Sequence, residues 1–315
     1  GLGGLISGAA GLFLSRPFRL LLLGRTIQGA GAGGTYQLAM ALTGDIFQSK
    51  ERTKALGLLE ASNGLGKVVS PVLGSLIALL SWYAPFFAYG LLSFPIALGV
   101  WFVVQEKKSG QSKTALKEYW QKLKSVFNEK ASLLLSSYFV GMSALFLLFG
   151  VLSYVSDLLE SRYHLFGLKK GFVLAIPVFA MALTSYLSGI FLSNKQSLWK
   201  PIIVGGMAGT ALALGILPLF SKLIPYLAVL FFLGVSIGIL LPPINSLITG
   251  ATSTDRRGII TCFYGTVRFF GVAMGPPAFG LGMELGQWFM FLASAAIAII
   301  GAVIALIFIS PPQPS

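Results

Sequence analysis

Long apolar runs separated by short polar links occupy most of the sequence. A helix that crosses a bilayer needs roughly 20 apolar residues, and every run except the first reaches that length. The pattern therefore predicts an all-α membrane protein that crosses the bilayer many times. The runs lie near residues 1–14, 17–47, 54–81, 85–104, 131–158, 171–193, 201–220, 224–250, 258–283 and 286–310.

The composition agrees with a membrane protein and argues against other classes. Of the 315 residues, 55% are hydrophobic and only 10% are charged, whereas a soluble domain has roughly 25% charged residues. A soluble enzyme or a nucleic-acid-binding protein is disfavoured, although the net charge is +13. One cysteine (Cys262) and one histidine (His164) exclude an intramolecular disulfide and leave few ligands for zinc. We expect no enzyme activity, no cofactor, no metal and no nucleic-acid partner.

The one long polar link, residues 105–130, contains seven lysines. Its second part spaces apolar residues as a helix does, which predicts a basic amphipathic helix. This helix either lies on an anionic inner leaflet or is a solvated linker between two bundles. Counted on alternate sides of the spans, fourteen Lys and Arg residues lie on the side of this link and six on the other. The positive-inside rule makes the link cytoplasmic in a multi-pass protein of the plasma (inner) membrane.

An internal repeat predicts two similar halves. Shifting the chain by 205 residues superposes Arg52 on Arg257, and it superposes the series Gly66, Ser70, Pro71 on the series Gly271, Gly275, Pro276. The predicted domains are residues 1–104, the linker 105–130 and residues 131–315, as in transporters built from parallel repeats. The same offset predicts that the first half begins about 74 residues before Gly1. The chain would then hold part of helix three and all of helices four to twelve.

Three segments resemble the major facilitator superfamily, and within it the proton-coupled drug antiporters. The span 17–47 contains an Arg followed by Gln-Gly-x-Gly, the span 54–81 has the spacing of the antiporter motif, and the span 258–283 is similar to helix eleven of bacterial drug exporters. Serine replaces glycine at two positions of the antiporter spacing. The matching positions are Arg25, Gln28, Gly29 and Gly31; Gly57, Gly66, Ser70, Pro71, Gly74 and Ser75; and Phe263 to Gly271 with Gly275 and Pro276.

The resemblance implies a major-facilitator-type bundle that works by alternating access. The expected function is proton-coupled efflux of a small organic compound or drug by a monomer, whose partners are the substrate, protons and the bilayer. No ATP-binding Walker sequence is present, so transport would be secondary. The alternatives are a metabolite symporter or uniporter, and a transporter-like sensor or assembly subunit. The family's signature loop would precede Gly1, and its second-half counterpart has Ser193 and Gln196 in place of Asp and Gly, which weakens a charge-relay role there.

Charged residues inside spans are the first candidate site, because each costs roughly 2.5–3.5 kcal/mol to insert. Arg25 lies roughly 12 Å from the outer surface at 1.5 Å per residue, so we expect an acidic partner on another helix, plausibly helix one. Glu60, Asn63 and Lys67 share one helix face, as do Thr261, Tyr264 and Arg268. The alternatives are a structural Glu60–Lys67 bridge and core packing of Tyr264. The candidates for proton coupling or the cavity wall are Arg25, Gln28, Glu60, Asn63, Lys67, Tyr264 and Arg268.

Small residues and helix ends provide the candidate gates. Small residues four apart allow another helix to approach closely, and Pro71 should bend its helix; ordinary tight packing is the alternative. At the cytoplasmic end, Asp45, with Arg52 nearby, could form an inter-helix ion pair that closes the inner gate, or could lie at a solvated helix end. We also expect Pro242 and Pro243 to interrupt their helix, where Asn245 would line the cavity. The gating and packing candidates are Gly57, Gly66, Ser70, Pro71, Gly74, Gly271, Gly275 and Pro276.

Overall fold

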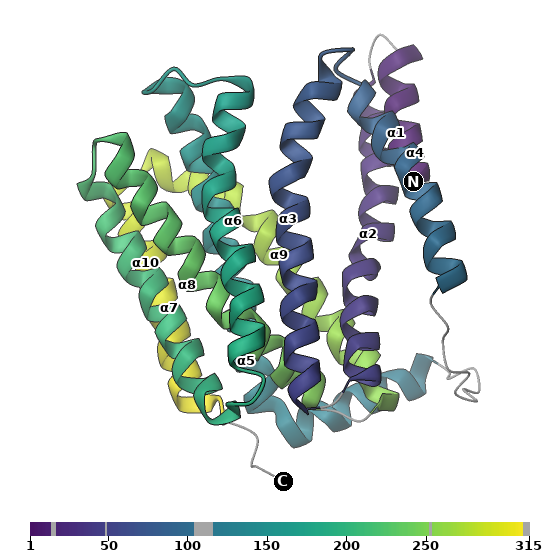
Figure 1. Cartoon of the computed structure of the whole chain (residues 1–315), viewed down its shortest axis with the longest axis vertical. Helices are drawn as coiled ribbons and strands as arrows, with labels where there is room; N and C mark the ends of the chain where they lie inside the picture. Colours follow the sequence, from purple (N-terminus) through teal and green to yellow (C-terminus); the bar gives the residue numbers. More distant parts are fainter. Residues whose placement is uncertain (14–16, 48, 104–115, 252–253, 311–315) are drawn as a thin grey trace. The chain divides into compact units, whose positions relative to one another are not determined.

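The computed structural model describes residues 1–13, 17–47, 49–103, 116–251 and 254–310, in which the secondary structure is helical (Figure 1). Each predicted apolar run coincides with one α-helix, so the all-α prediction is confirmed. The α-helices are α1 (Leu2–Phe13), α2 (Phe18–Ile46), α3 (Ser49–Ala78), α4 (Ala84–Val103), α5 (Leu116–Ser161), α6 (Gly167–Phe191), α7 (Trp199–Ile216), α8 (Leu223–Gly250), α9 (Thr254–Glu284) and α10 (Gln287–Phe308), with short 3₁₀ turns at Gln196–Leu198 and Leu217–Leu219.

Seven of the described helices, α4 to α10, are long and apolar enough to cross a membrane. Helix α1 is apolar but shorter. Helices α2 and α3 are longer, at 29 and 30 residues, but polar residues such as Arg25, Gln28, Glu60 and Lys67 lower their mean hydropathy. Large apolar side chains on the outside, such as Trp101 at 81% exposure and Phe270 at 60%, are suited to contact with lipid chains.

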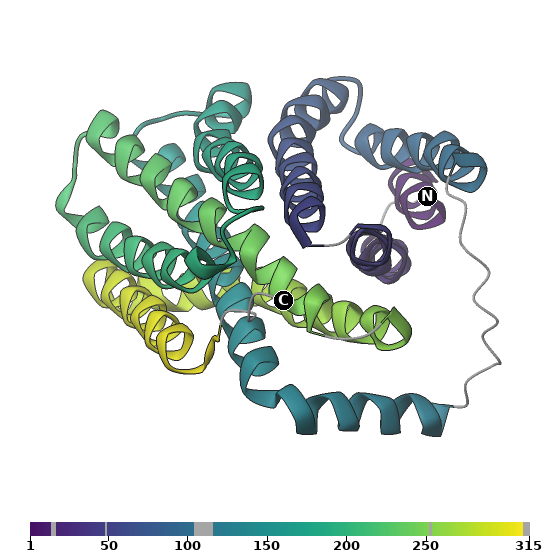
Figure 2. The same ribbon diagram turned by 60° about the horizontal axis from the view of Figure 1, so that its bottom comes forward.

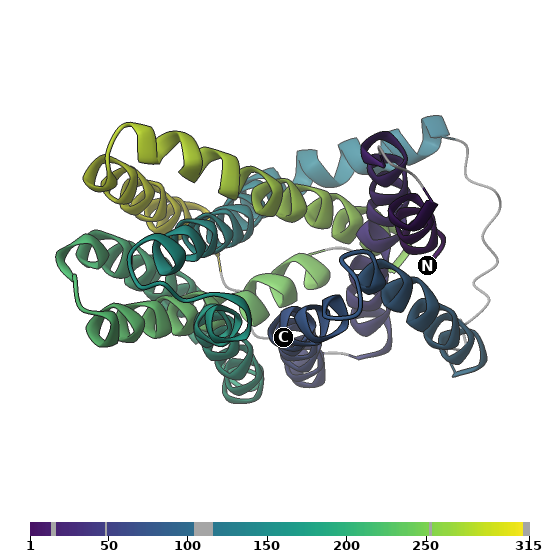
Figure 3. The same ribbon diagram turned by 90° about the horizontal axis from the view of Figure 1, so that it is seen from above.

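The chain forms two compact units, and their boundaries pass through α2, α3 and α5 rather than between helices. The first unit comprises residues 1–36 and 70–121, and the second comprises residues 37–69 and 122–315. In the first unit α1 packs against α4; in the second, α8 packs against α6 and α7, and α7 packs against α10 (Figure 3). The division into halves at residues 1–104 and 131–315 stays a prediction from the repeat.

Helix α5 contains the predicted basic helix and the following span, joined at a bend. Lys130 has non-helical dihedral angles, φ −133° and ψ 28°, and residues 122–129 turn away from the rest of α5 (Figure 2). The Lys130 ammonium donates a hydrogen bond to the carbonyl oxygen of Ala251 at 2.7 Å. The first part of the predicted linker, residues 105–115, lies outside the described residues.

The prediction that Pro242 and Pro243 interrupt their helix is wrong. Helix α8 continues through both prolines to Gly250, and both prolines are buried. Packing against α6 and α7 keeps the helix continuous, since neighbouring helices can compensate for backbone hydrogen bonds that proline removes.

Candidate functional site

A buried polar cluster joins three helices of the second unit. Glu60 of α3 accepts hydrogen bonds through Oε1 from Nη1 of Arg268 (α9) at 2.7 Å and from Nδ2 of Asn245 (α8) at 2.9 Å. The three residues are almost inaccessible, with exposures of 1% for Glu60, 3% for Arg268 and 0% for Asn245. We call Glu60, Asn245 and Arg268 the buried cluster.

The buried cluster places an acid and a base together where a lone charge would be very unfavourable. Removing one partner of a buried ion pair typically costs about 3–5 kcal/mol, because the remaining charge has lost its compensation. The alternative of a Glu60–Lys67 bridge is wrong for the described residues, where Glu60 pairs with Arg268. Seven residues along one helix span roughly 10 Å at 1.5 Å per residue, which explains why Glu60 pairs across helices instead.

Lys67 lies two turns along α3 from Glu60 and has an aromatic ring beside its ammonium group. Its Nζ lies 5.4 Å from the centroid of the Phe149 ring of α5. The side chain is half-buried, and its charge interacts electrostatically with Glu60 and Arg268. A cation–π contact of this kind contributes roughly 0.5–2 kcal/mol, less than the roughly 2.5–3.5 kcal/mol cost of a charge inside a span. Asn63, on the same face, is also half-buried.

The predicted polar face of α9 is buried as a whole. Thr261 and Tyr264 have 0% exposure, and the Tyr264 ring lies 5.4 Å from the guanidinium carbon of Arg268. Tyr264 also stacks on Tyr138 of α5, with ring centroids 5.4 Å apart. The alternative of core packing therefore describes Tyr264 well, and its ring additionally supports the cation of the buried cluster.

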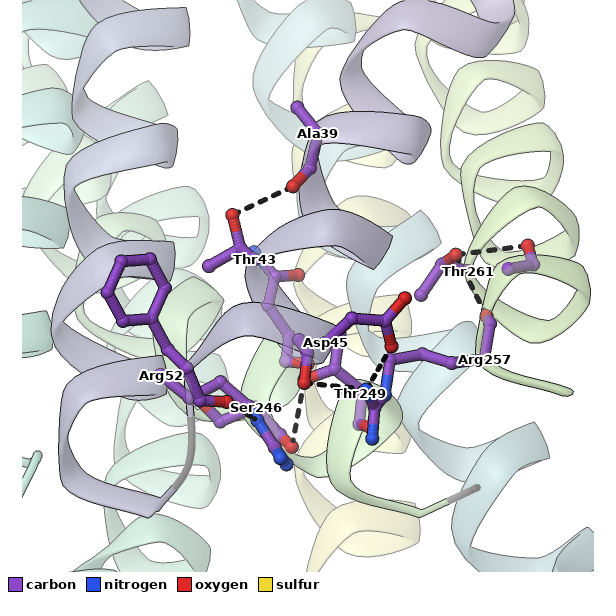
Figure 4. Close-up of polar contacts among 12 residues, drawn as sticks. Ala39, Thr43, Asp45, Arg52, Ser246, Thr249, Arg257 and Thr261 are labelled. Carbon is purple, nitrogen blue, oxygen red and sulfur yellow. Dashed lines mark hydrogen bonds and ion pairs between the residues drawn. The ribbon is translucent and has the colours of Figure 1, made fainter. Parts of the chain in front are cut away.

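A second polar group lies at the predicted cytoplasmic ends of α2, α8 and α9 (Figure 4). Arg257 of α9 donates from Nε to the carbonyl oxygen of Thr249 at 2.7 Å and from Nη1 to the carbonyl oxygen of Gly44 at 2.6 Å. The same Nη1 forms an ion pair with Asp45 of α2. We call Gly44, Asp45, Thr249 and Arg257 the arginine junction. The inter-helix ion pair expected for Asp45 is formed, and its partner is Arg257.

Arg52, predicted to lie near Asp45, lies beside Gly250, and its charge also interacts with Asp45. Its Nη1 is 3.0 Å from where a Cβ of Gly250 would stand, and its Nε donates to the carbonyl oxygen of Phe47 at 3.2 Å. Burial and the charge of Arg257 lower the pKa of Arg52 below its ordinary value. The nearby ends of α3 and α8 are joined by Ser246, whose hydroxyl donates to Oγ1 of Thr53 at 3.0 Å.

The 205-residue repeat relates the two arginines and their surroundings. It superposes Gly44 on Thr249, and Asp45 on Gly250, as well as Arg52 on Arg257. Arg257 thus binds the carbonyl oxygens of Gly44 and Thr249, which the repeat relates, and the carboxylate of Asp45. Arg52 lies beside Gly250, which occupies the position of Asp45 in the second half of the repeat. Arg257 was not among the site residues predicted from the sequence. The repeat could have indicated it, because it superposes Arg257 on the gate candidate Arg52.

Helix α3 approaches α6 closely at two of its glycines. A Cβ added at Gly57 would lie 2.7 Å from Cα of Gly189, and one added at Gly64 would lie 3.1 Å from Cα of Ala182. We call this contact the α3–α6 seam. No atom lies within 4 Å of a Cβ added at Gly66 or at Gly74, among the residues that the structure describes. In this structure Gly57 therefore makes a close contact, whereas Gly66 and Gly74, two of the small residues spaced four apart on α3, do not. A gating role of this row of small residues (the ridge) stays a prediction.

The corresponding small residues of α9 pack directly on α5. A Cβ added at Gly271 would lie 2.6 Å from the carbonyl oxygen of Met142, and one at Gly275 would lie 2.7 Å from that of Phe146. The close approach expected of these two glycines is therefore present in the second half of the repeat. Pro276 lies inside α9, which continues to Glu284.

Arg25 is in the first unit and is exposed there. It donates from Nη1 to Oε1 of Gln28 at 2.6 Å, and its guanidinium carbon lies 5.3 Å from the centroid of the Phe86 ring. Residues 1–36 and 70–103 contain no Asp or Glu, so within these segments an amide and an aromatic ring are its neighbours. The acidic partner predicted for Arg25 stays a prediction.

Comparison with known proteins identifies relatives along the whole chain. Residues 1–276 match the sequence profile of the Major Facilitator Superfamily. A bacillibactin exporter of Bacillus subtilis is 33% identical over 310 residues, which cover 97% of this chain and 77% of the exporter. The multidrug resistance protein MdtL of Salmonella typhimurium is 34% identical over 109 residues, or 34% of this chain and 28% of MdtL.

A solved structure supports the fold. The crystal structure of the human organic anion transporter MFSD10 (TETRAN) superposes with a TM-score of 0.68 and 17% sequence identity. The superposition covers 96% of this chain and 75% of the human protein. At this level of identity the similarity concerns the fold alone.

Proposed function

Because the chain belongs to the major facilitator superfamily, we propose that it is a secondary transporter that exports a small organic compound in exchange for protons. The observation that carries this proposal is the buried cluster. It places a carboxylate, a group that can bind and release a proton, inside the helical bundle and pairs it with a base on another helix. Ionisable residues inside membrane spans commonly mark proton and substrate pathways.

The buried cluster can couple a proton to a movement of helices. With Glu60 ionised, its charge balances that of Arg268 and holds α3 against α8 and α9. When Glu60 binds a proton, it loses its negative charge, so its attraction to Arg268 weakens and α3 can separate from α9. Loss of the proton on the other side of the membrane restores the pair. Such a cycle links proton uptake and release to alternating access.

The arginine junction and the α3–α6 seam supply a closed gate at the predicted cytoplasmic side. Arg257 holds the ends of α2, α8 and α9 together, and Gly57 lets α3 and α6 approach to backbone contact. Opening toward the cytoplasm requires both contacts to separate. We assign this gate to the cytoplasmic face, in the plasma membrane, from the excess of Lys and Arg in the connecting loops.

Export is favoured over metabolite uptake by the names of the relatives. One is named a bacillibactin exporter and another a multidrug resistance protein. Bacillibactin or a related compound is therefore the first substrate to test.

The test uses inside-out membrane vesicles that contain the protein as its gene encodes it, with bacillibactin as the probe. We expect uptake when the vesicle lumen is acidic, loss of uptake when the proton gradient is dissipated, and no effect of ATP depletion. The variant Glu60→Gln should abolish the response to the gradient, whereas Lys170→Gln, which breaks an exposed ion pair with Glu160, should behave as wild type. Uptake that needs ATP and ignores the gradient would disprove proton exchange.

A further inference from the structure

The interior of the second unit has more basic than acidic side chains. Among the side chains that the structure describes, three charged ones lie well inside its spans: Glu60 and Lys67 on α3, and Arg268 on α9. One negative and two positive charges leave an excess of one positive charge. The other acids of these helices whose side chains the structure describes lie near helix ends and are exposed, so they do not balance it: Asp45, Glu51, Asp157, Glu160 and Glu284.

The excess charge is located at Lys67. Glu60 carries one negative charge, its Oε1 already accepts hydrogen bonds from Arg268 and Asn245, and the same charge also attracts Lys67, so one acid faces two cations. Within the part of the chain that the structure describes, no salt bridge is formed by Lys67, and its Nζ lies 5.4 Å from the centroid of the Phe149 ring. An ammonium group in this apolar setting favours the arrival of a negative charge.

We propose that Lys67 binds the substrate and that the substrate is an organic anion. This inference rests on the proposed transport function and names the substrate class for it. A carboxylate or another acidic group would pair with the ammonium of Lys67, while Arg268 stays bound to Glu60. A cationic compound would be repelled by the excess positive charge at Lys67. The position of Lys67 on the face of Glu60 brings the bound anion close to the residue that binds the proton.

The test compares three probes of the same ring and similar size that differ in charge. Equilibrium binding of naphthalene-2-carboxylate, naphthalene-2-carboxamide and 2-naphthylmethylammonium is measured with the full protein in lipid nanodiscs. We expect the carboxylate to bind at least tenfold more tightly than the amide, and the ammonium to bind most weakly. In Lys67→Gln the carboxylate should lose at least tenfold in affinity, while Lys67→Arg should keep the preference. Lys170→Gln is the matched control for removing a lysine.

The outcomes separate this inference from the proposed function. Equal binding of the three probes, binding of none, or an unchanged preference in Lys67→Gln would overturn the role of Lys67, even if vesicles export bacillibactin. Conversely, charge-selective binding that depends on Lys67 would support the inference even if proton-driven export failed. If Lys67→Gln does not fold, the ranking of the probes on the unmodified protein still tests the substrate class, and a lost preference in Lys67→Arg would still contradict the role of Lys67.

Discussion

Arg257 of α9 forms an ion pair with Asp45 of α2, 212 positions earlier in the chain. The same guanidinium binds the carbonyl oxygens of Gly44 and Thr249, which the repeat relates to each other. One side chain therefore joins helix ends from both predicted halves. The role of the arginine junction can therefore be tested by exchanging the charges of Asp45 and Arg257.

Exchanging the charges of the junction should separate electrostatics from packing. We expect Asp45→Arg and Arg257→Asp each to reduce the proposed export at least tenfold, because each places like charges together. The double variant should recover part of the activity, since the ion pair returns but the bonds to the two carbonyl oxygens do not. Exchange of the exposed Glu160–Lys170 pair is the control and should leave export unchanged. No recovery in the double variant would mean that the Asp45–Arg257 charge pair does not operate the gate.

Adding an acid opposite Arg52 should overstabilise the closed gate. Gly250 is the repeat counterpart of Asp45, and Arg52 lies beside it, so Gly250→Asp would create a second ion pair. We expect a lower maximal export rate with unchanged protein level, because opening must break both pairs. Adding Arg52→Gln to this variant should restore the rate. The result is checked by initial rates in vesicles, and a wild-type rate in Gly250→Asp would contradict it.

The buried cluster should show strong coupling between its two charges. Glu60→Gln or Arg268→Gln alone should lower the free energy of unfolding by about 3–5 kcal/mol, because one buried charge is left uncompensated. The double variant should recover most of this stability and remain unable to couple export to protons. Thermal unfolding in detergent and gradient-driven uptake measure the two effects. Additive losses of stability would show that the two residues do not act as a pair.

The two glycine positions of α3 should respond differently to alanine. Gly57→Ala places a methyl group against the backbone of Gly189, so we expect a lower unfolding temperature and less export. Gly66→Ala meets open space in this structure, so stability should be unchanged. If the Gly66 ridge closes on another helix during the cycle, Gly66→Ala will nevertheless reduce export. Full export by Gly66→Ala would remove the gating role of this position.

Arg25 should be essential for coupled export although it lies apart from the buried cluster in sequence. A guanidinium stays charged at all physiological pH values, and the segments around Arg25 offer it an amide and an aromatic ring. We expect Arg25→Ala to insert normally but to lose gradient-driven export. Arg25→Lys should keep partial activity because the charge remains while the planar fork is lost. Coupled export at the wild-type level by Arg25→Ala would make the residue structural only.

The sequence by itself determined the number and positions of the described helices and the family. These features follow from local patterns, namely apolar runs of bilayer length and short motifs of fixed spacing, which do not depend on distant contacts. The sequence also identified Glu60, Lys67 and Arg268 as charges inside spans, because such residues stand out against an apolar background.

Only the tertiary structure decided which of these residues meet. The partner of Glu60 is Arg268, 208 positions away, and the partner of Asp45 is Arg257, because both pairs depend on how neighbouring helices are rotated and placed. The α8 prolines, predicted to break their helix, are accommodated in it by packing on both sides. Gly57 and Gly66 are the same residue type on one helix, yet one contacts a neighbouring backbone and the other faces open space. Local periodicity determines which residues share a helix face. Which other helix packs against that face depends on the free energy of packing all the helices together.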